Sequence, residues 1–258
     1  MEHPGEMKQE PIIQCKGVCK TFYTGKASLE AIRDLSLDVY ENEFVVILGP
    51  GQCGKTTLVN MIAGLEPVTS GEALYKNTCV TAPNPKLGVV YQTTALFPWF
   101  TVMKNVDFGL RMKKVPKKDR LKRAQYFIDL VGLTGFENTF PVHLSGGMRQ
   151  RVGIARAYCN DPDVLLMDEP FGHLDAQTRY SMQKEIENIW NKEKRTVLFI
   201  TNNIEEAVYL ADRIILLTNT PTKVKEEIRI DLPRPRIYTS KDFLLLRKRL
   251  SSVFDVTK

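Results

Sequence analysis

Three separate segments of the sequence carry side chains that could bind and cleave a phosphate anhydride. The first is residues 49–56, which fit the pattern G-x-x-x-x-G-K-[ST] and lie between an apolar run and a helical pattern. In such a loop, successive backbone N–H groups and the start of the helix surround phosphate oxygens. Lys55 would reach the β- and γ-phosphates, and the Thr56 hydroxyl would ligate Mg²⁺. The segment therefore predicts a site for a nucleoside triphosphate.

The second segment has two adjacent acids, Asp168 and Glu169, directly after the apolar run 164–167. At the end of a buried strand, Asp168 can hold Mg²⁺ through water, while Glu169 can polarise an attacking water. Two such acids could also be ordinary loop residues. Their presence in a chain that also carries Lys55 and Thr56 favours a site for metal-assisted hydrolysis.

The third segment, residues 144–151, predicts a second phosphate-binding helix end. Ser145 can cap the helix that follows, and Gly146 and Gly147 leave its first turn bare, so N–H groups face outward. Taken alone, the segment is also an ordinary glycine-rich turn before an amphipathic helix. One chain has no evident need for two phosphate cradles, unless the second serves the nucleotide bound to another copy.

The apolar pattern predicts the elements that must bring these segments together. Four continuous apolar runs are typical of strands buried on both faces of a parallel sheet. They cover residues 44–48, 87–91, 164–167 and 197–200. Because helical patterns separate these runs, we expect right-handed crossovers and a parallel α/β sheet.

Three further regions complete the predicted fold. Short β-like pieces at 11–15 and 32–39 alternate with turn residues and indicate a small antiparallel region. The pattern is helical throughout 101–160, which predicts a helical lobe inserted between strands. After residue 218 the sequence predicts a strand, a Pro-rich link and an amphipathic helix, over 223–230, 232–236 and 243–253.

Composition indicates one large domain, or one domain with a small lobe. The 258 residues are 43% hydrophobic, and no apolar run approaches the roughly 18 residues that a bilayer span needs. The first ten residues lack the pattern of a secretory signal, so we expect a frayed tail in a cytoplasmic protein. The five cysteines form no CxxC pair and the three histidines are scattered, which favours reduced thiols and no zinc site.

The net charge of +6 would fit nucleic acid, phosphate ligands or an anionic membrane face. Much of the excess lies in residues 111–123. Such a run is usually a solvated helix surface, and contact with lipid headgroups or a partner is the alternative.

With these motifs, the sequence resembles the ATP-binding subunit of an ABC transporter over about residues 11–235. The resemblance implies a P-loop NTPase ABC cassette, with a RecA-like parallel-sheet core, an antiparallel β subdomain and an inserted helical subdomain at about 96–160. A flexible tail would precede it at 1–10, and a C-terminal helical tail would follow at 236–258. The implied cofactors are ATP and Mg²⁺.

The resemblance also implies the roles of individual residues. Glu169 is the counterpart of the catalytic glutamate, Gln92 of the Q-loop glutamine, and Asn202 lies at the switch position. Mg²⁺ would be held by Thr56, Gln92 and Asp168. Phe22 is similar to the aromatic that stacks on adenine, with Tyr23 as a nearby substitute. The residues expected to contact ATP are Phe22, Gly49, Pro50, Gly51, Gln52, Cys53, Gly54, Lys55, Thr56, Thr57, Ser145, Gly146, Gly147, Gln150 and Asp175.

Finer similarity is to the importer branch that serves nitrate, taurine and aliphatic sulfonates, at residues 96–105, 167–172, 174–179 and 231–236. It implies a head-to-tail dimer, with an identical or a different second cassette, that encloses two ATP molecules. It also implies integral membrane permease subunits, a periplasmic or lipoprotein solute-binding protein, and a place on the inner face of the cell membrane. Phe97, Trp99 and Phe100 form an apolar cluster that would suit docking of a membrane subunit, with burial in the helical lobe as the alternative.

Two departures from the family pattern bear on activity. Gln52 stands where glycine is usual, and at φ > 0 a non-glycine residue costs on the order of 1 kcal/mol. Asn202 and Asn203 stand where histidine and aspartate are usual. Asn202 can donate a hydrogen bond but has no proton to exchange, and losing one acid–base group typically costs about 10²- to 10⁴-fold in rate. Alternatively, Asn202 is a harmless substitute, and Asn203 is a good N-cap for the next helix.

Three hypotheses follow for function. The first is an ATP-hydrolysing motor subunit of a small-solute importer. The second is a regulatory nucleotide-binding subunit of low turnover, because of Asn202. The third is an ABC-type ATPase acting on nucleic acid, which the absence of a coiled-coil insertion or a second cassette disfavours, so no nucleic-acid partner is expected.

Overall fold

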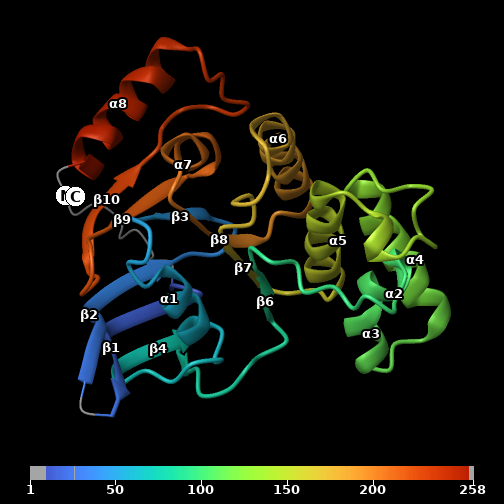
Figure 1. Ribbon diagram of the computed structural model, residues 1–258, viewed down its shortest axis with the longest axis horizontal. Coiled ribbons are helices and arrows are strands. Elements are labelled where there is room, and N and C mark those ends of the chain that lie inside the picture. The colour runs from blue at the N-terminus through green and yellow to red at the C-terminus, as the bar shows by residue number, and fades with distance from the viewer. Residues whose placement is uncertain (1–9, 26, 256–258) are drawn as a thin grey trace, which may run out of the picture.

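The apolar runs pair with one another in a six-stranded sheet, as the computed structural model shows for residues 10–25 and 27–255 (Figure 1). The strand order is β10-β9-β3-β8-β7-β6, and every pair is parallel except β9 with β10. This confirms the predicted parallel sheet. Its strands are β3 (Phe44–Leu48), β6 (Leu87–Val90), β7 (Val164–Asp168), β8 (Thr196–Thr201), β9 (Arg213–Leu217) and β10 (Val224–Arg229).

The register of the sheet aligns the carboxyl ends of its central strands. Leu48 pairs with Thr201, Asp168 pairs with Ile200, and Val90 pairs with Met167. Parallel strands release their following loops at the same edge of the sheet, where ligands of open α/β folds bind. The loops after β3, β6, β7 and β8 therefore begin side by side.

A second, antiparallel sheet has the order β2-β1-β4-β5. It comprises β1 (Ile13–Thr24), β2 (Ala27–Val39), β4 (Ser70–Tyr75) and β5 (Thr78–Cys79). The short predicted pieces are wrong in length, because β1 and β2 form one long hairpin whose register shifts are absorbed at Gly17, with φ +55°, and its neighbours. The sequence pattern did not predict β4, β5 or β9.

The core lies on both faces of the parallel sheet. Alternate residues of β3 point to opposite layers: Phe44 and Val46 join one buried cluster, while Val45 and Ile47 join the other. The second cluster also holds α1 (Lys55–Ile62) and residues of the antiparallel sheet. Burial on both faces explains why each central strand is apolar throughout, so that polar chemistry is left to the strand ends.

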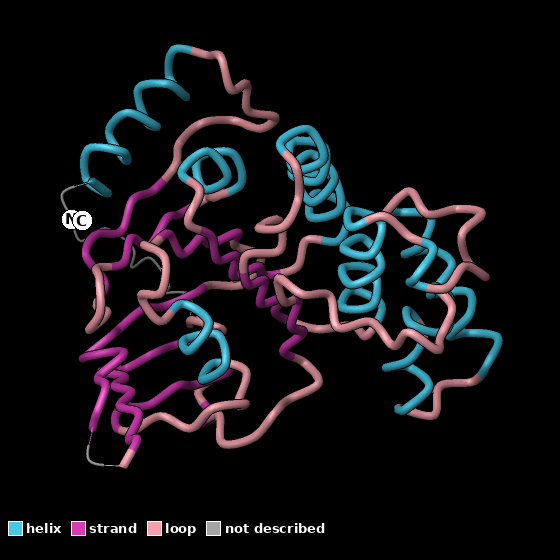
Figure 2. Tube along the Cα trace, viewed as in Figure 1, coloured by secondary structure: helices cyan, strands magenta, loops and turns pink. Residues whose placement is uncertain are grey.

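Apart from α1, which lies beside the antiparallel sheet, the α-helices can be followed as two sets (Figures 1 and 2). One is a lobe made of α2 (Val102–Val106), α3 (Phe108–Met112), α4 (Lys117–Leu130) and α5 (Gly146–Cys159). The other comprises α6 (Ala176–Glu193), α7 (Ile204–Leu210) and α8 (Lys241–Asp255). The prediction of helix throughout 101–160 is wrong for 131–145, which contain only the short 3-10 helix η1 (Pro141–His143) among these described residues.

No helix in the described part of the chain has the length and apolar character that crossing a bilayer demands. The predicted frayed tail at 1–10 lies outside the described residues except for Glu10. The predicted solvated face at 111–123 agrees with the exposure of Lys114, Lys117 and Lys118, while Arg123 donates to the carbonyl of Cys159 at 2.9 Å. Contact of this run with lipid or a partner stays a prediction.

A half-buried ion pair ties the helical lobe to the core. Arg151 on α5 lies 2.8 Å from the Glu185 carboxylate on α6, and donates to the Val131 carbonyl at 3.0 Å. Both side chains line a cleft of about 620 Å³ between lobe and core. Within the part of the chain that the structure describes, the second carboxylate oxygen of Glu185 is buried without a hydrogen-bond partner. Burial raises the pKa of Glu185 to about 7, although Arg151 opposes the shift.

We expect this acid to make stability depend on pH. Because its pKa is raised in the folded chain, its contribution is fully present below its ordinary pKa of 4.5 and is lost as pH rises through 7. Relative to Glu185→Gln, the free energy of unfolding of the wild type should fall over that range by about 1 to 3 kcal/mol. Urea unfolding at several pH values measures this. Glu226→Gln, in the exposed pair with Arg249, is the control, and parallel curves for wild type and Glu185→Gln would contradict the prediction.

Candidate functional site

The loop between β3 and α1 wraps around its own lysine. Gly54 is the N-cap of α1 with φ +92°, and Lys55 begins the helix with its side chain buried. The Lys55 ammonium donates to the carbonyls of Gly49 at 3.1 Å and Pro50 at 2.6 Å. It also lies 3.2 Å from a carboxylate oxygen of Glu169. The predicted strand–loop–helix context is confirmed, and the charge of Lys55 faces the end of β7.

Two acids at the end of β7 complete this cluster. Thr56 donates its hydroxyl to Asp168 at 2.6 Å, although 112 residues separate the two. The other carboxylate oxygen of Asp168 is buried and has no hydrogen-bond partner among the described residues. Burial raises the pKa of Asp168 and the charge of Glu169 raises it further, while Thr56 and Lys55 lower it. The site thus holds an ammonium, two carboxylates and an unsatisfied buried oxygen, which can accept a cation or a bound water.

The loop is held open by a segment that the sequence did not indicate. Thr220 donates to the carbonyl of Gln52 at 3.3 Å, and Thr222 donates to the carbonyl of Cys53. Gln52 has φ +61°, so the expected left-handed conformation of this non-glycine residue is confirmed. Gly49 is required by space, because a Cβ there would lie 2.9 Å from the sulfur of Cys53.

Gln92 lies against the turn that follows Glu169. A Cβ on Gly172 would lie 2.5 Å from Nε2 of Gln92, and Gly172 donates its N–H to the Glu169 carbonyl at 3.0 Å. Gln92 is therefore brought to the same edge of the sheet as the acids. Gln150 is buried and its amide lies 3.5 Å from the Tyr91 carbonyl, so it contacts the neighbour of Gln92 within its own chain.

Two helix starts lie side by side on another surface. Ser145 caps α5 by accepting from the Met148 N–H at 3.2 Å, which confirms the predicted cap. Asp175 caps α6 by accepting from the Thr178 N–H at 3.0 Å, and this bond lowers its pKa. A Cβ on Gly147 would lie 2.9 Å from the Thr178 side chain.

These helix starts are not joined to the Gly-rich loop in one chain. Helix α5 belongs to the lobe, and α1 lies on the opposite side of β6 and β7 (Figure 1). The structure therefore brings Lys55, Thr56, Asp168, Glu169 and Gln92 together, and it leaves the bare first turn of α5 apart from them.

Phe22 lies on the hairpin that borders the Gly-rich loop. Its strand neighbour Lys20 pairs with Ile32, and a side-chain carbon of Ile32 would lie 3.5 Å from a Cβ on Gly54. The Phe22 ring is 37% exposed, with the Lys20 ammonium 4.9 Å from its centroid. Tyr23 is 75% exposed. Both aromatic side chains are exposed, although the Lys20 ammonium lies over the Phe22 ring.

The two adjacent asparagines differ completely in their contacts. Asn203 caps α7, because its side-chain oxygen accepts from the N–H groups of Glu205 at 2.8 Å and Glu206 at 3.2 Å. This confirms the predicted cap. Asn202 is exposed, and its side chain makes no hydrogen bond with any described residue. Backbone bonds from Gly49 to Thr201 and from Glu169 to Ile200 tie the start of this turn between the Gly-rich loop and the acids.

The aromatic cluster after Gln92 is only partly exposed. Trp99 is 67% exposed, whereas Phe97 and Phe100 are half-buried against Phe108, with ring centroids 4.5 and 6.0 Å away. The buried Asn105 fixes this loop by accepting from the Phe97 N–H and donating to three nearby carbonyls.

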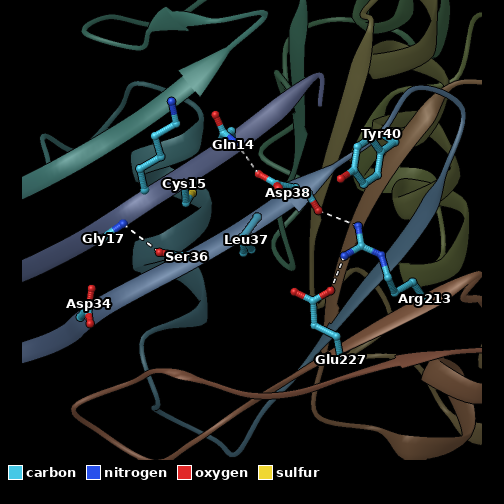
Figure 3. Close-up of a pocket in the computed structure, with 11 residues that line it drawn as sticks. Gln14, Cys15, Gly17, Asp34, Ser36, Leu37, Asp38, Tyr40, Arg213 and Glu227 are labelled. Carbon is cyan, nitrogen blue, oxygen red and sulfur yellow. Dashed lines mark hydrogen bonds and ion pairs between the residues drawn. The ribbon is translucent and has the colours of Figure 1, made fainter. Parts of the chain in front are cut away.

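A separate hollow of about 440 Å³ lies between β1, β2 and the end of β10 (Figure 3). Arg213 spans it and is bound by Glu43 at 2.8 Å, Glu227 at 2.6 Å and the Asp38 carbonyl at 2.6 Å. Arg213 thereby joins the two sheets, and the hollow contains none of the predicted site residues.

A Gly-rich loop after a parallel strand, with acids at the end of a neighbouring strand, defines the P-loop nucleoside triphosphatases. Comparison with known proteins identifies the family within this class. The family model described as ABC transporter matches residues 32–172. The chain is 48% identical over 257 residues to an uncharacterized ABC transporter ATP-binding protein of Methanocaldococcus jannaschii, covering 98% of this chain and 96% of that one. The chain therefore belongs to the ABC transporter ATP-binding family, and it is an ATP-binding ATPase subunit.

Two further similarities agree with this family. An aliphatic sulfonates import ATP-binding protein of Bacillus cereus is 40% identical over 243 residues, covering 94% of this chain and 96% of that one. A dimeric ATP-binding cassette solved in a post-hydrolysis state with ADP and Pi is 31% identical with a TM-score of 0.76. That similarity covers 86% of this chain and all of that one, and it confirms the expected cassette fold.

The contacts of the two asparagines predict that only one of them supports stability. Asn203→Ala removes the cap of α7 and should lower the free energy of unfolding by about 1 to 2 kcal/mol, while Asn203→Asp keeps the acceptor and should cost little. Asn202→Ala should stay within about 0.5 kcal/mol of the wild type, because the side chain has no partner to lose. Urea unfolding at pH 7 measures all three. Equal losses for the two alanine variants would contradict this assignment.

Proposed function

We propose that the chain works as one of two ATP-binding subunits that energise an importer of small solutes. The observation that carries the proposal is the split site: Lys55, Thr56, Asp168 and Glu169 lie together, while the bare helix start after Ser145 lies elsewhere. A head-to-tail dimer, of identical or different cassettes, would bring Ser145, Gly146, Gly147 and Gln150 of one copy to the nucleotide held by the other. The solved dimeric cassette supports this arrangement.

Within each site, the chain's own groups would share the work. Backbone N–H groups of Gly49, Pro50, Gly51, Gln52, Cys53 and Gly54 would surround the phosphates, with Lys55, Thr56 and Thr57 at the helix start. Phe22 would stack on adenine. Glu169 would orient and polarise the attacking water, with Gln92 and Asn202 beside it. Asp175 would contribute from the partner's side.

Mg²⁺ fits the donor set that the chain offers. Hard divalent cations prefer carboxylate, hydroxyl and water oxygens, and Asp168 has a buried carboxylate oxygen with no partner next to the Thr56 hydroxyl. Thr56, Asp168 and Gln92 are the residues proposed to hold it. When bound, the cation would neutralise charge that develops on the phosphate oxygens.

The remaining partners are proposed from the family. Trp99 and the half-buried Phe97 and Phe100 would dock a helix of a permease subunit, which suits a cytoplasmic subunit on the inner face of the membrane. A periplasmic or lipoprotein binding protein would deliver the solute. The Bacillus cereus relative named for aliphatic sulfonates supports sulfonates as the solute class. Nitrate and taurine are proposed on the sequence resemblance alone. We also propose that residues 11–235 form the ATP-binding domain, that its helical subdomain covers about 96–160, and that residues 236–258 form a C-terminal tail.

Asn202 is the reason to keep a second candidate function, a regulatory subunit of low turnover. We expect Asn202→His to raise the kcat of ATP hydrolysis by about 10²-fold, because the imidazole restores a group that can exchange protons. Glu169→Gln should reduce turnover to background. Phosphate release by the three purified proteins measures this.

Each hypothesis can fail separately in that comparison. A wild-type rate near that of Asn202→His would contradict the regulatory alternative. A wild-type rate as low as that of Glu169→Gln would contradict the motor function for a dimer of identical chains.

A thermal shift tests the proposed Mg²⁺ site without turnover. Ligands that bind the folded state raise Tm by mass action. In the wild type, ATP with Mg²⁺ should raise Tm further than ATP with EDTA, and Asp168→Asn should abolish that difference while leaving the chain without nucleotide equally stable or more so. Asp163→Asn, directly before the other end of β7, is the matched control. A difference that persists in Asp168→Asn would contradict the role of this acid.

A further inference from the structure

Glu206 is a buried acid close to the site that none of the roles above uses. It lies in the first turn of α7, and only 4% of its surface is exposed. One carboxylate oxygen accepts from the Thr201 hydroxyl at 2.6 Å. The Thr201 oxygen in turn accepts from the N–H of Asn203 at 3.0 Å. These two bonds link Thr201, Asn203 and Glu206 across the turn that contains Asn202.

The arrangement resembles a capping box with one extra step. In a capping box, the acid at the third helical position reaches back to the N–H of the cap residue. Here Glu206 reaches that N–H through the hydroxyl of Thr201, and Asn203 accepts from the N–H of Glu206 at 3.2 Å. A cap alone, however, needs no burial. An exposed carboxylate could accept the same capping hydrogen bond without a desolvation cost.

The second oxygen of Glu206 faces another element. It lies 3.6 Å from Nε of Arg179 on α6, and that Nε is buried with no hydrogen-bond partner in residues 10–25 and 27–255. The same guanidinium donates to the Leu174 carbonyl at 3.0 Å, next to Asp175. Burial raises the pKa of Glu206 and the charge of Glu169 adds to this, while Thr201, Arg179 and Gln183 lower it, so Glu169 lies within electrostatic reach of Glu206.

We propose that Glu206 is a positioning residue that fixes the turn bearing Asn202 and ties it, through Arg179, to the Leu174–Asp175 segment. The inference rests on the proposed place of Asn202 beside the terminal phosphate. It adds a route within one chain between that position and the surface where α5 and α6 begin. Glu206 touches neither nucleotide nor water in this role, and acts through Thr201 and Arg179.

The test compares Glu206→Gln and Thr201→Val with Thr201→Ser, which keeps the hydroxyl. Glu187→Gln is the matched control, because Glu187 is also buried, accepts from the Tyr209 hydroxyl at 3.0 Å and lies 3.8 Å from an arginine. We expect Glu206→Gln and Thr201→Val to lower kcat about tenfold with KM for MgATP nearly unchanged. Both changes would displace Asn202 from the terminal phosphate, and a small misplacement at the reacting centre costs rate. Thr201→Ser should keep kcat near the wild-type value, because it retains the hydroxyl. Glu187→Gln should lower Tm without changing kcat.

A double-mutant cycle separates positioning from general damage. In an Asn202→Ala background, Glu206→Gln should change kcat by less than about twofold, because the group that it positions is gone. A full effect in that background, or equal losses of kcat in Glu206→Gln and Glu187→Gln, would overturn the proposal.

If the wild type hydrolyses ATP no faster than Glu169→Gln, the motor function is contradicted and kcat cannot test Glu206. Hydrogen exchange then tests the role of Glu206 instead. Glu206→Gln should then speed amide exchange both at 201–206 and at 174–179, and Glu187→Gln at neither. Faster exchange confined to 201–206 would reduce Glu206 to a local helix cap and overturn the link to Leu174.

Discussion

The parallel register of β3, β8, β7 and β6 is the constraint on which the site depends. Strands β3, β7 and β8 are buried on both faces and the edge strand β6 is half-buried in its middle, so a charged side chain along β3, β7 or β8 would carry a desolvation cost. Polar groups are therefore restricted to the strand ends, and parallel pairing collects those ends at one edge. Lys55, Asp168 and Thr201 meet there although they are far apart in the sequence.

The charges collected at this edge are not fully balanced within the chain. Lys55 satisfies two loop carbonyls and pairs with Glu169, but Asp168 keeps a buried oxygen that nothing in the described chain satisfies. A buried unsatisfied polar group costs about 1 to 3 kcal/mol. The unpaired oxygen of Asp168 therefore lowers the stability of the folded chain and leaves an acceptor ready for a ligand. Binding sites commonly lower stability in this way.

The parts of the fold that follow from local pattern could be predicted from the sequence. The four apolar runs became β3, β6, β7 and β8, and the caps at Ser145 and Asn203 are where side-chain chemistry favours them. Contacts between distant segments could not be predicted. Thr222 supports the loop at Cys53 across 169 residues, and no feature near either residue indicates it. The length of β1 was missed because Gly17 and its neighbours absorb a register shift that interrupts the alternation expected of a strand.

The contacts of the 201–206 turn bear on what the asparagine at position 202 changes. Asn203 caps the helix, Thr201 and Glu206 close the turn, and the Asn202 side chain takes part in none of these bonds. The backbone at position 202 is thus held by its neighbours, whichever residue stands there. With position 202 beside the nucleotide, as proposed, asparagine in place of histidine would alter the chemistry presented there and leave its location unchanged. The turn is held by Thr201, Asn203 and Glu206, so the fold of this segment does not depend on the side chain at position 202.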